Sequence, residues 1–344
     1  SDPAVHFDKV EILLRTERKE EAAEASEQAV QEFPENPDAF VLHGDVVSKL
    51  GRTDTAIALY ERALEIAPEH VRGLSQLGNS LAEQLRFEEA LGIFDRLLAK
   101  RPKDAEAVLC RGLLLVKLQR TAEGLAEVDR AIDLDAKLLE AYLQKARILK
   151  TAGRLDEAKE AAELAIRKTP RYLEGYVVAA DIALEQGDID RVFALTDRAQ
   201  AIDGTAPDVW RLKSQGHARK GRAAAATVCR GLHFLYLGQH EAALAEMEGA
   251  ADLEPELPHA WHHMGTVLEA MGRDQDALEA YKKALALDDT SPKVLFAAGL
   301  LVAEKLDRFE DGVRVLQKAC SYNAKLWNAL PPHLQKRVSK PGFW

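Results

Sequence analysis

Three histidines in the segment PHAWHHMG have a spacing that can bring imidazole rings together. His259, His262 and His263 stand at i, i+3 and i+4, which are neighbouring positions on one face of a helix. Imidazoles so placed occur in metal-binding helices, but no HExxH motif accompanies them here. We therefore expect a polar stretch of surface at this segment and no metal site.

The other reactive residue types lack the motifs that catalysis requires. The chain has no GxxxxGK[ST] or GxGxxG loop to hold a phosphate, and no GxSxG turn to present a nucleophilic serine. Its cysteines, Cys110, Cys229 and Cys320, lie far apart, which disfavours a disulfide framework and favours a reducing, cytoplasmic compartment. We expect no cofactor and no catalytic site, so the chain is predicted not to be an enzyme.

The elements that carry these residues recur with a period of 34. The segment PDAFVLHGDVVSKLGRTDTAIALYERALEIAPEH, residues 37–70, is followed directly by a copy in which Gly78 and Phe94 match Gly44 and Tyr60. Within each period the apolar residues have helical spacing twice, with a break between the two runs. A fixed period of this length indicates stacked helix pairs that form a solenoid.

Small residues recur at one place in each helix of the pair. A glycine inside a helix costs about 1 kcal/mol relative to alanine, so its recurrence predicts a close helix–helix approach that offsets this cost. In the first helix the small residues are Gly44, Gly78, Gly112, Ala146, Ala180, Gly231, Gly265 and Gly299. In the second helix they are Ala22, Ala56, Ala90, Ala158, Ala243 and Ala277.

This pattern resembles that of the tetratricopeptide-repeat (TPR) family. One unit carries the family's large and small residues in order, namely Trp261, Met264, Gly265, Leu268, Ala277, Tyr281 and Ala284. The resemblance covers residues 3–326 and implies an all-α fold, a right-handed α-solenoid of stacked antiparallel helix pairs. It further implies a concave groove, lined by the first helices, that holds a peptide. Alanine- and arginine-rich usage favours a bacterial source.

The repeat register divides the chain into four parts. Residues 3–206 hold six repeats, residues 224–326 hold three, and residues 207–223 are a half repeat or a break in register. Two explanations of the break stay open: a second helix was lost, or residues are absent around Ala223–Ala226. The last part, 327–344, is predicted to be a capping helix that carries Leu334 and Val338, or the start of a linker.

Composition narrows the class of partner. The net charge of −10 disfavours nucleic acid, which needs a basic face, and no apolar run is long enough to span a membrane. We therefore expect a protein or peptide partner. The leading hypothesis is a non-catalytic scaffold that binds this partner in the groove. Alternatives are a targeting module of a larger enzyme, such as a transferase or hydroxylase, and self-association through an end repeat.

The resemblance implies which positions of the first helices face the groove, and these positions give the candidate binding residues. Asp45, Lys49 and Ser75 are also expected in the groove. The apolar members are expected to supply affinity and the arginines to orient the ligand, unless the array itself covers them. The set is Asn79, Leu109, Leu113, Val116, Arg147, Val177, Arg211, Val228, Leu232, Leu235, His262 and Phe296.

Overall fold

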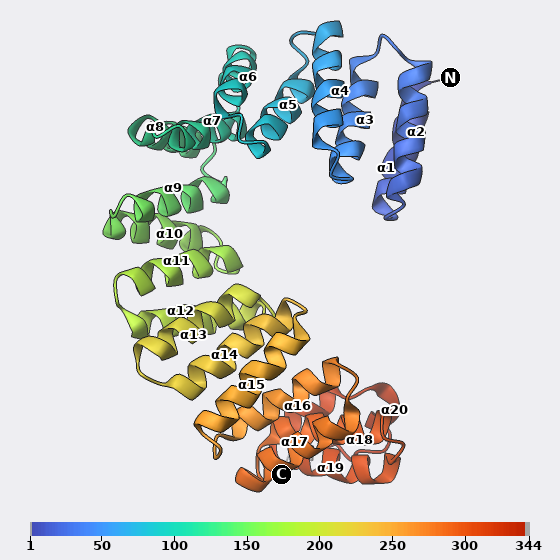
Figure 1. Cartoon of the computed structure of the whole chain (residues 1–344), viewed down its shortest axis with the longest axis vertical. Coiled ribbons are helices and arrows are strands. Elements are labelled where there is room, and N and C mark those ends of the chain that lie inside the picture. Colours follow the sequence, from blue (N-terminus) through green and yellow to red (C-terminus); the bar gives the residue numbers. More distant parts are fainter. Residues whose placement is uncertain (1, 341–344) are drawn as a thin grey trace. The chain divides into compact units, whose positions relative to one another are not determined.

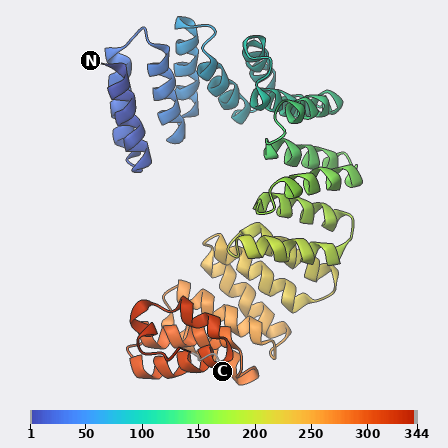
Figure 2. The same cartoon turned by 180° about the vertical axis from the view of Figure 1, so that it is seen from behind.

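The computed structural model describes residues 2–340, which form helices joined by short turns (Figure 1). Within these residues there is no β-strand. The chain divides into two compact units, Ser1–Pro170 and Arg171–Trp344, and in each unit consecutive helices run side by side (Figure 2). The all-α solenoid of stacked helix pairs predicted from the repeat is confirmed.

Helices of 13 or 14 residues fill most of both units, and shorter ones stand at the C-terminal end. Those of unit 1 are α1 (Pro3–Arg15), α2 (Lys19–Glu32), α3 (Pro37–Lys49), α4 (Thr53–Ile66), α5 (Val71–Glu83), α6 (Phe87–Lys100), α7 (Ala105–Lys117), α8 (Thr121–Leu134), α9 (Leu139–Thr151) and α10 (Leu155–Lys168). Those of unit 2 are α11 (Leu173–Glu185), α12 (Ile189–Ile202), α13 (Pro207–Arg219), α14 (Ala223–Tyr236), α15 (His240–Leu253), α16 (Pro258–Ala270), α17 (Asp274–Leu287), α18 (Pro292–Glu304), α19 (Phe309–Tyr322), the 3₁₀ helix η1 (Ala324–Ala329) and α20 (Pro332–Gln335).

In most pairs the leading helix has 13 residues and the following helix 14, as in α3 and α4. The leading helix α3 begins with Pro37, and the Asn36 side chain accepts a hydrogen bond from the N–H of Asp38. Proline at the first position and a capping amide both favour a helix start. The following helix α8 begins instead after Arg120, whose guanidinium donates two hydrogen bonds to the Glu123 carboxylate, at 2.8 and 2.6 Å. Local sequence thus favours the start of each of these two helices.

The turn inside each pair needs one residue with a left-handed backbone. Gly51 takes this place between α3 and α4 with a φ of 75°, and glycines do so in several other pairs. Leu85 takes the same place between α5 and α6 with a φ of 62°. A left-handed backbone costs a non-glycine residue about 1–2 kcal/mol, so this turn holds local strain.

Leu85→Gly is therefore expected to stabilise the protein by about 1 kcal/mol, after allowance for the entropy of glycine in the unfolded chain. The Leu85 side chain is 72% exposed, so little packing is lost. Urea unfolding would measure the gain, with Gly51→Leu as the reciprocal variant that loses stability. A lower unfolding midpoint for Leu85→Gly would contradict strain at this turn.

Aromatic rings of the following helices lie across the glycines of the leading helices. A Cβ built on Gly44 would lie 2.4 Å from Cε1 of Tyr60, and one on Gly78 would lie 2.7 Å from Cε2 of Phe94. Both rings are 1% exposed. The recurrent small residue therefore makes room for a buried ring, which is the packing gain expected for a glycine inside a helix.

Helix α14 is a member of two pairs at once (Figure 1). As a following helix it carries Ala226 at the usual fourth position, and the Ala226 carbonyl accepts a hydrogen bond from Ser214 Oγ of α13 at 2.7 Å. As a leading helix it carries Gly231, where a Cβ would lie 3.2 Å from the Ala243 carbonyl oxygen of α15. One helix thus makes both kinds of close contact.

This double use accounts physically for the shortened period at residues 207–223. The α13/α14 and α14/α15 pairs share helix α14, so these two pairs consist of three helices instead of four. The ion pair between Arg230 of α14 and Glu246 of α15, at 2.6 Å, corresponds to the Arg111–Glu127 pair of α7 and α8 at 3.1 Å. The shared helix therefore keeps the side-chain contacts of an ordinary leading helix.

The C-terminal segment covers the last helix pair, α18 and α19. Leu330, Leu334 and Val338 are 4%, 0% and 2% exposed and form one apolar cluster with residues of these two helices. The Trp327 Nε1–H donates a hydrogen bond to the Val338 carbonyl at 2.9 Å. The predicted tail also includes residues 341–344, which lie outside the described residues.

Residues 2–340 contain no helix with the length and apolar character that crossing a bilayer requires.

Candidate functional site

Two adjoining hollows lie on the leading-helix side of unit 1. One, of about 460 Å³, is lined by residues of α1, α3, α4 and α5, and the other, of about 710 Å³, by residues of α5, α6, α7 and their turns. Arg72 and Gln76 of α5 line both hollows, so the two hollows adjoin at these residues. We call the two hollows together the unit 1 groove and define it by Asp45, Lys49, Arg72, Ser75, Gln76, Asn79 and Cys110.

Asp45 of α3 organises the middle of this groove. Its carboxylate accepts hydrogen bonds from Tyr60 Oη at 2.9 Å, Gln76 Nε2 at 2.6 Å and Arg72 Nη2 at 2.6 Å. The Asp45 side chain is only 11% exposed, and the Arg72 side chain is 53% exposed. Burial and the neighbouring carboxylate raise the pKa of Tyr60, which keeps its hydroxyl a donor. Asp45 therefore holds Arg72 and Gln76 in fixed positions along the groove.

Asn79 and Cys110 continue the groove toward α7. The Asn79 side chain is exposed, and its Oδ1 lies 4.0 Å from Cys110 Sγ. A carboxamide offers one acceptor and two donors, which can pair with the N–H and C=O groups of an extended peptide. Burial raises the pKa of Cys110 to about 11, so the thiol stays protonated at neutral pH and is a poor nucleophile. The chemistry here suits binding.

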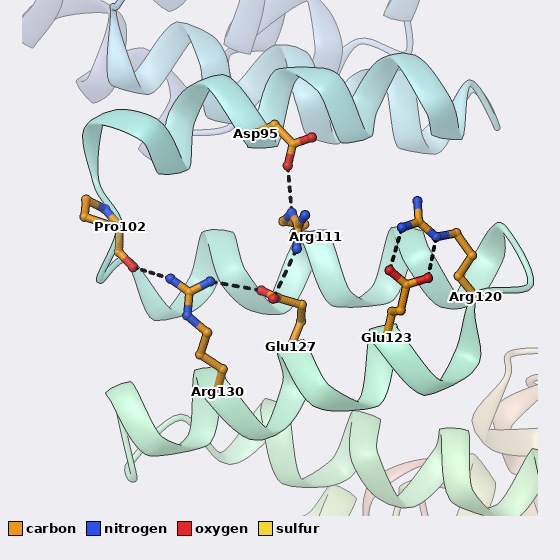
Figure 3. Close-up of polar contacts among 7 residues, drawn as sticks. All are labelled: Asp95, Pro102, Arg111, Arg120, Glu123, Glu127 and Arg130. Atoms are coloured by element: carbon orange, nitrogen blue, oxygen red, sulfur yellow. Dashed lines mark hydrogen bonds and ion pairs between the residues drawn. The ribbon is translucent and has the colours of Figure 1, made fainter.

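Ion pairs hold together the helices that carry this end of the groove (Figure 3). Arg111 of α7 reaches Asp95 of α6 at 2.7 Å and Glu127 of α8 at 3.1 Å. Arg130 of α8 donates to Glu127 at 3.2 Å and to the Pro102 carbonyl at 2.7 Å. Arg111 and Arg130 thus link α8 to α6, α7 and the intervening turn, which favours a preformed surface.

The residues predicted in unit 1 lie in different places. Asn79 lines the groove, whereas Leu113 and Val116 are partly buried on α7 in an apolar cluster with Leu109. Arg147 is exposed on α9, and its Nη1 lies 3.4 Å from a Glu140 carboxylate oxygen. Of the candidate set the groove contains Asn79, and it also contains Asp45, Lys49 and Ser75, which the same projection had brought there.

Three predicted apolar residues are covered by the helix packing and offer almost no surface to a ligand. Leu109, Val228 and Leu232 are 5%, 6% and 2% exposed. The last two lie on α14, where neighbouring helices cover both faces because this helix belongs to two pairs. The expectation that these side chains form a water-exposed patch is corrected: they are part of the core.

The remaining predicted residues of unit 2 do not form one surface. Val177 and His262 are partly buried on α11 and α16. Leu235 packs against the cluster around α14 to α17, while Phe296 packs against the C-terminal cluster. Arg211 donates from Nε to Asp208 of its own helix at 2.9 Å. These contacts pack the helices together and, at Arg211, stabilise the helix that carries it.

The histidine segment lies on α16, with the rings of His262 and His263 stacked at 4.7 Å. Burial lowers the pKa of His262 to about 4 and that of His263 to about 3, and His259 and Lys293 add to the effect on each. Both imidazoles are therefore neutral at pH 7. The described part of the chain holds no group of three or more His, Cys, Asp or Glu placed to bind a metal ion.

Sequence projection missed Arg72, Gln76 and Cys110. It took mainly the fifth and ninth positions of the leading helices, as at Ser75 and Asn79, whereas these residues stand at the second and sixth. The signal was present in the helical period, since Arg72, Gln76 and Asn79 are spaced i, i+4 and i+7 and share one face. Extending the projection by one turn toward the helix start would have found them.

Models of the tetratricopeptide repeat match residues 7–71, 48–109, 139–170 and 258–291. A curated protein, "Small glutamine-rich tetratricopeptide repeat-containing protein 2" of Mycosarcoma maydis, is 32% identical over 62 residues. The aligned region spans 18% of this chain and 18% of that relative.

Solved structures resemble the fold. A tetratricopeptide repeat protein from Parabacteroides merdae aligns with 73% of this chain and 93% of its own at a TM-score of 0.53 and 22% identity. PilW, described as a widely conserved type IV pilus biogenesis factor, aligns with 60% of this chain and 96% of its own at a TM-score of 0.55 and 20% identity. At these identities the likeness concerns the helical array.

Proposed function

This chain belongs to the tetratricopeptide-repeat family, and from that premise we propose that it is a non-catalytic scaffold that binds an extended segment of a partner protein in the unit 1 groove. The observation that carries the proposal is the row formed by Arg72, Gln76 and Asn79. All three side chains line the hollow between α5 and α7, and Asp45 holds the first two in place.

The groove chemistry favours recognition of a peptide backbone. The Asn79 amide can donate to a backbone carbonyl and accept from a backbone N–H. The Arg72 guanidinium keeps donors free beyond the one bound to Asp45, because arginine has five N–H groups. Since these donors are already held in place, less side-chain entropy is lost on binding.

We expect Asn79→Ala to weaken binding of a groove peptide about five- to tenfold, since a hydrogen bond contributes about 1 kcal/mol. The probe is a peptide selected on the wild-type protein from a random 12-residue display library, and fluorescence polarisation measures its Kd. Glu88→Ala, at an exposed position of α6, is the matched control and should leave the Kd unchanged. Equal affinity of the selected peptides for wild type and Asn79→Ala would refute the groove assignment.

A further inference from the structure

An arginine connects successive helix pairs at two places in unit 1. Arg96 of α6 donates from Nη2 to the Pro68 carbonyl at 2.9 Å, and Arg130 of α8 donates from Nη2 to the Pro102 carbonyl at 2.7 Å. Arg130 also lies 3.2 Å from a Glu127 carboxylate oxygen (Figure 3). Both arginines stand at the tenth position of their helix, which we call the bridging position.

In α10 a leucine takes the bridging position. Leu164 is the tenth residue of this helix, and the carbonyl equivalent to that of Pro102 belongs to Ala136. The ion pair of Lys145 with Asp129, at 2.6 Å, corresponds to that between α7 and α6 one period earlier, so the packing register is unchanged. A leucine has no donor for the carbonyl, and the bridge is therefore missing from an otherwise regular helix pair.

A hollow of about 720 Å³ lies at this place, lined by residues of α8, α9 and α10. Leu164, which is 36% exposed, and the partly buried Ile132 give it an apolar wall. The Ala136 carbonyl accepts from Tyr142 Oη at 3.4 Å, and a carbonyl oxygen has a second lone pair for another donor. We call this the α10 hollow and define it by Ile132, Asp133, Tyr142, Glu160 and Leu164.

The charges around the α10 hollow favour a cationic ligand. Its lining includes more carboxylates than cations, and the cations are Lys145 and Arg167. Both cations already pair with carboxylates of the chain, at 2.6 and 3.7 Å. Among the residues that the structure describes, Asp133 and Glu160 are exposed and have no ion-pair partner within 4.0 Å. The hollow thus offers negative charge beside an apolar wall.

We propose that the α10 hollow binds an arginine side chain carried by a basic segment of a partner protein. The guanidinium takes the place that Arg130 has one period earlier, donates to the Ala136 carbonyl and pairs with the carboxylates of the hollow. Its methylene stem lies against Leu164. Arginine suits the hollow better than lysine, because its planar fork of N–H donors serves a carbonyl and a carboxylate at once. The α10 hollow shares no residue with the unit 1 groove, so it is a second binding surface.

The probe for this proposal is N-acetyl-arginine-N-methylamide, titrated into the whole chain while NMR follows the backbone amide chemical shifts. Saturable shifts are expected around Ala136 and Leu164. N-acetyl-lysine-N-methylamide should bind about fivefold more weakly, because it loses about one hydrogen bond. Leu164→Arg gives the chain its own guanidinium at the bridging position, so this variant should no longer bind the probe in the hollow.

The double variant Asp133→Asn/Glu160→Gln removes the unpaired charges and should weaken probe binding about tenfold. Glu61→Gln, at an exposed position of α4, is the matched control and should bind like wild type. Circular dichroism verifies that all variants stay helical. The absence of saturable shifts in wild type would overturn the proposal. So would shifts around Asn79 that persist in Leu164→Arg, because that result would place the arginine in the unit 1 groove.

Discussion

Replacing Gly124 with alanine is expected to destabilise the protein by about 1–3 kcal/mol, although alanine stands at this position in most other following helices. A Cβ on Gly124 would lie 2.5 Å from Val116 Cγ2 and 2.7 Å from the Gly112 carbonyl oxygen. The second contact is with backbone, which cannot rotate away. The variant therefore has to separate α7 from α8 and lose part of their packing.

Gly92→Ala is the matched control for this substitution. Gly92 lies inside α6, and a Cβ there would meet no atom within 4 Å. Alanine in a helix interior is favoured over glycine by about 1 kcal/mol, so this variant should gain stability. In urea unfolding, Gly124→Ala should lower the free energy of unfolding and Gly92→Ala should raise it. If both variants were stabilised alike, α7 and α8 would not be in the close contact that the structure shows.

Glycine and alanine at the repeat positions show what sequence could predict about the fold. Their period fixed the helix pairs, because close helix packing demands small residues whatever the partner. It left the break at residues 207–223 open, because the register resumes only 17 residues after Pro207 and the period does not tell whether a helix was lost or residues are absent. The contacts of Ala226 with α13 and of Gly231 with α15 show that α14 belongs to two pairs, and these contacts are visible only in the structure.

The candidate site was less predictable for a different reason. Periodicity places Leu109 and Leu232 on the inner side of their helices, but it does not tell how closely the next pair covers that side. Both are buried. Asn79 stays exposed, since a carboxamide is costly to bury without partners. In this chain the polar inner residue Asn79 was a better indicator of free surface than the apolar Leu109 and Leu232.

Lowering the pH from 7 to 4 is expected to destabilise the wild-type protein through His263. Burial lowers the pKa of this imidazole to about 3, with contributions from His262, His259 and Lys293, whereas the unfolded chain titrates near 6.5. Below pH 6.5 the unfolded state therefore binds a proton that the folded state does not, and stability falls as pH falls. At pH 4 the loss is about 2–3 kcal/mol, and it levels off near pH 3.

His263→Leu should remove this part of the acid sensitivity. Leucine stands at the equivalent sixth position of α3 and α13, as Leu42 and Leu212, so the site accepts its shape. Unfolding free energies measured in urea from pH 7 to 4 should fall less steeply for this variant than for wild type. His333→Gln, which replaces a side chain 59% exposed, should follow the wild-type curve. Parallel curves for wild type and His263→Leu would contradict this account. They would mean that His263 is protonated while the protein stays folded, because water then reaches the stacked rings on α16.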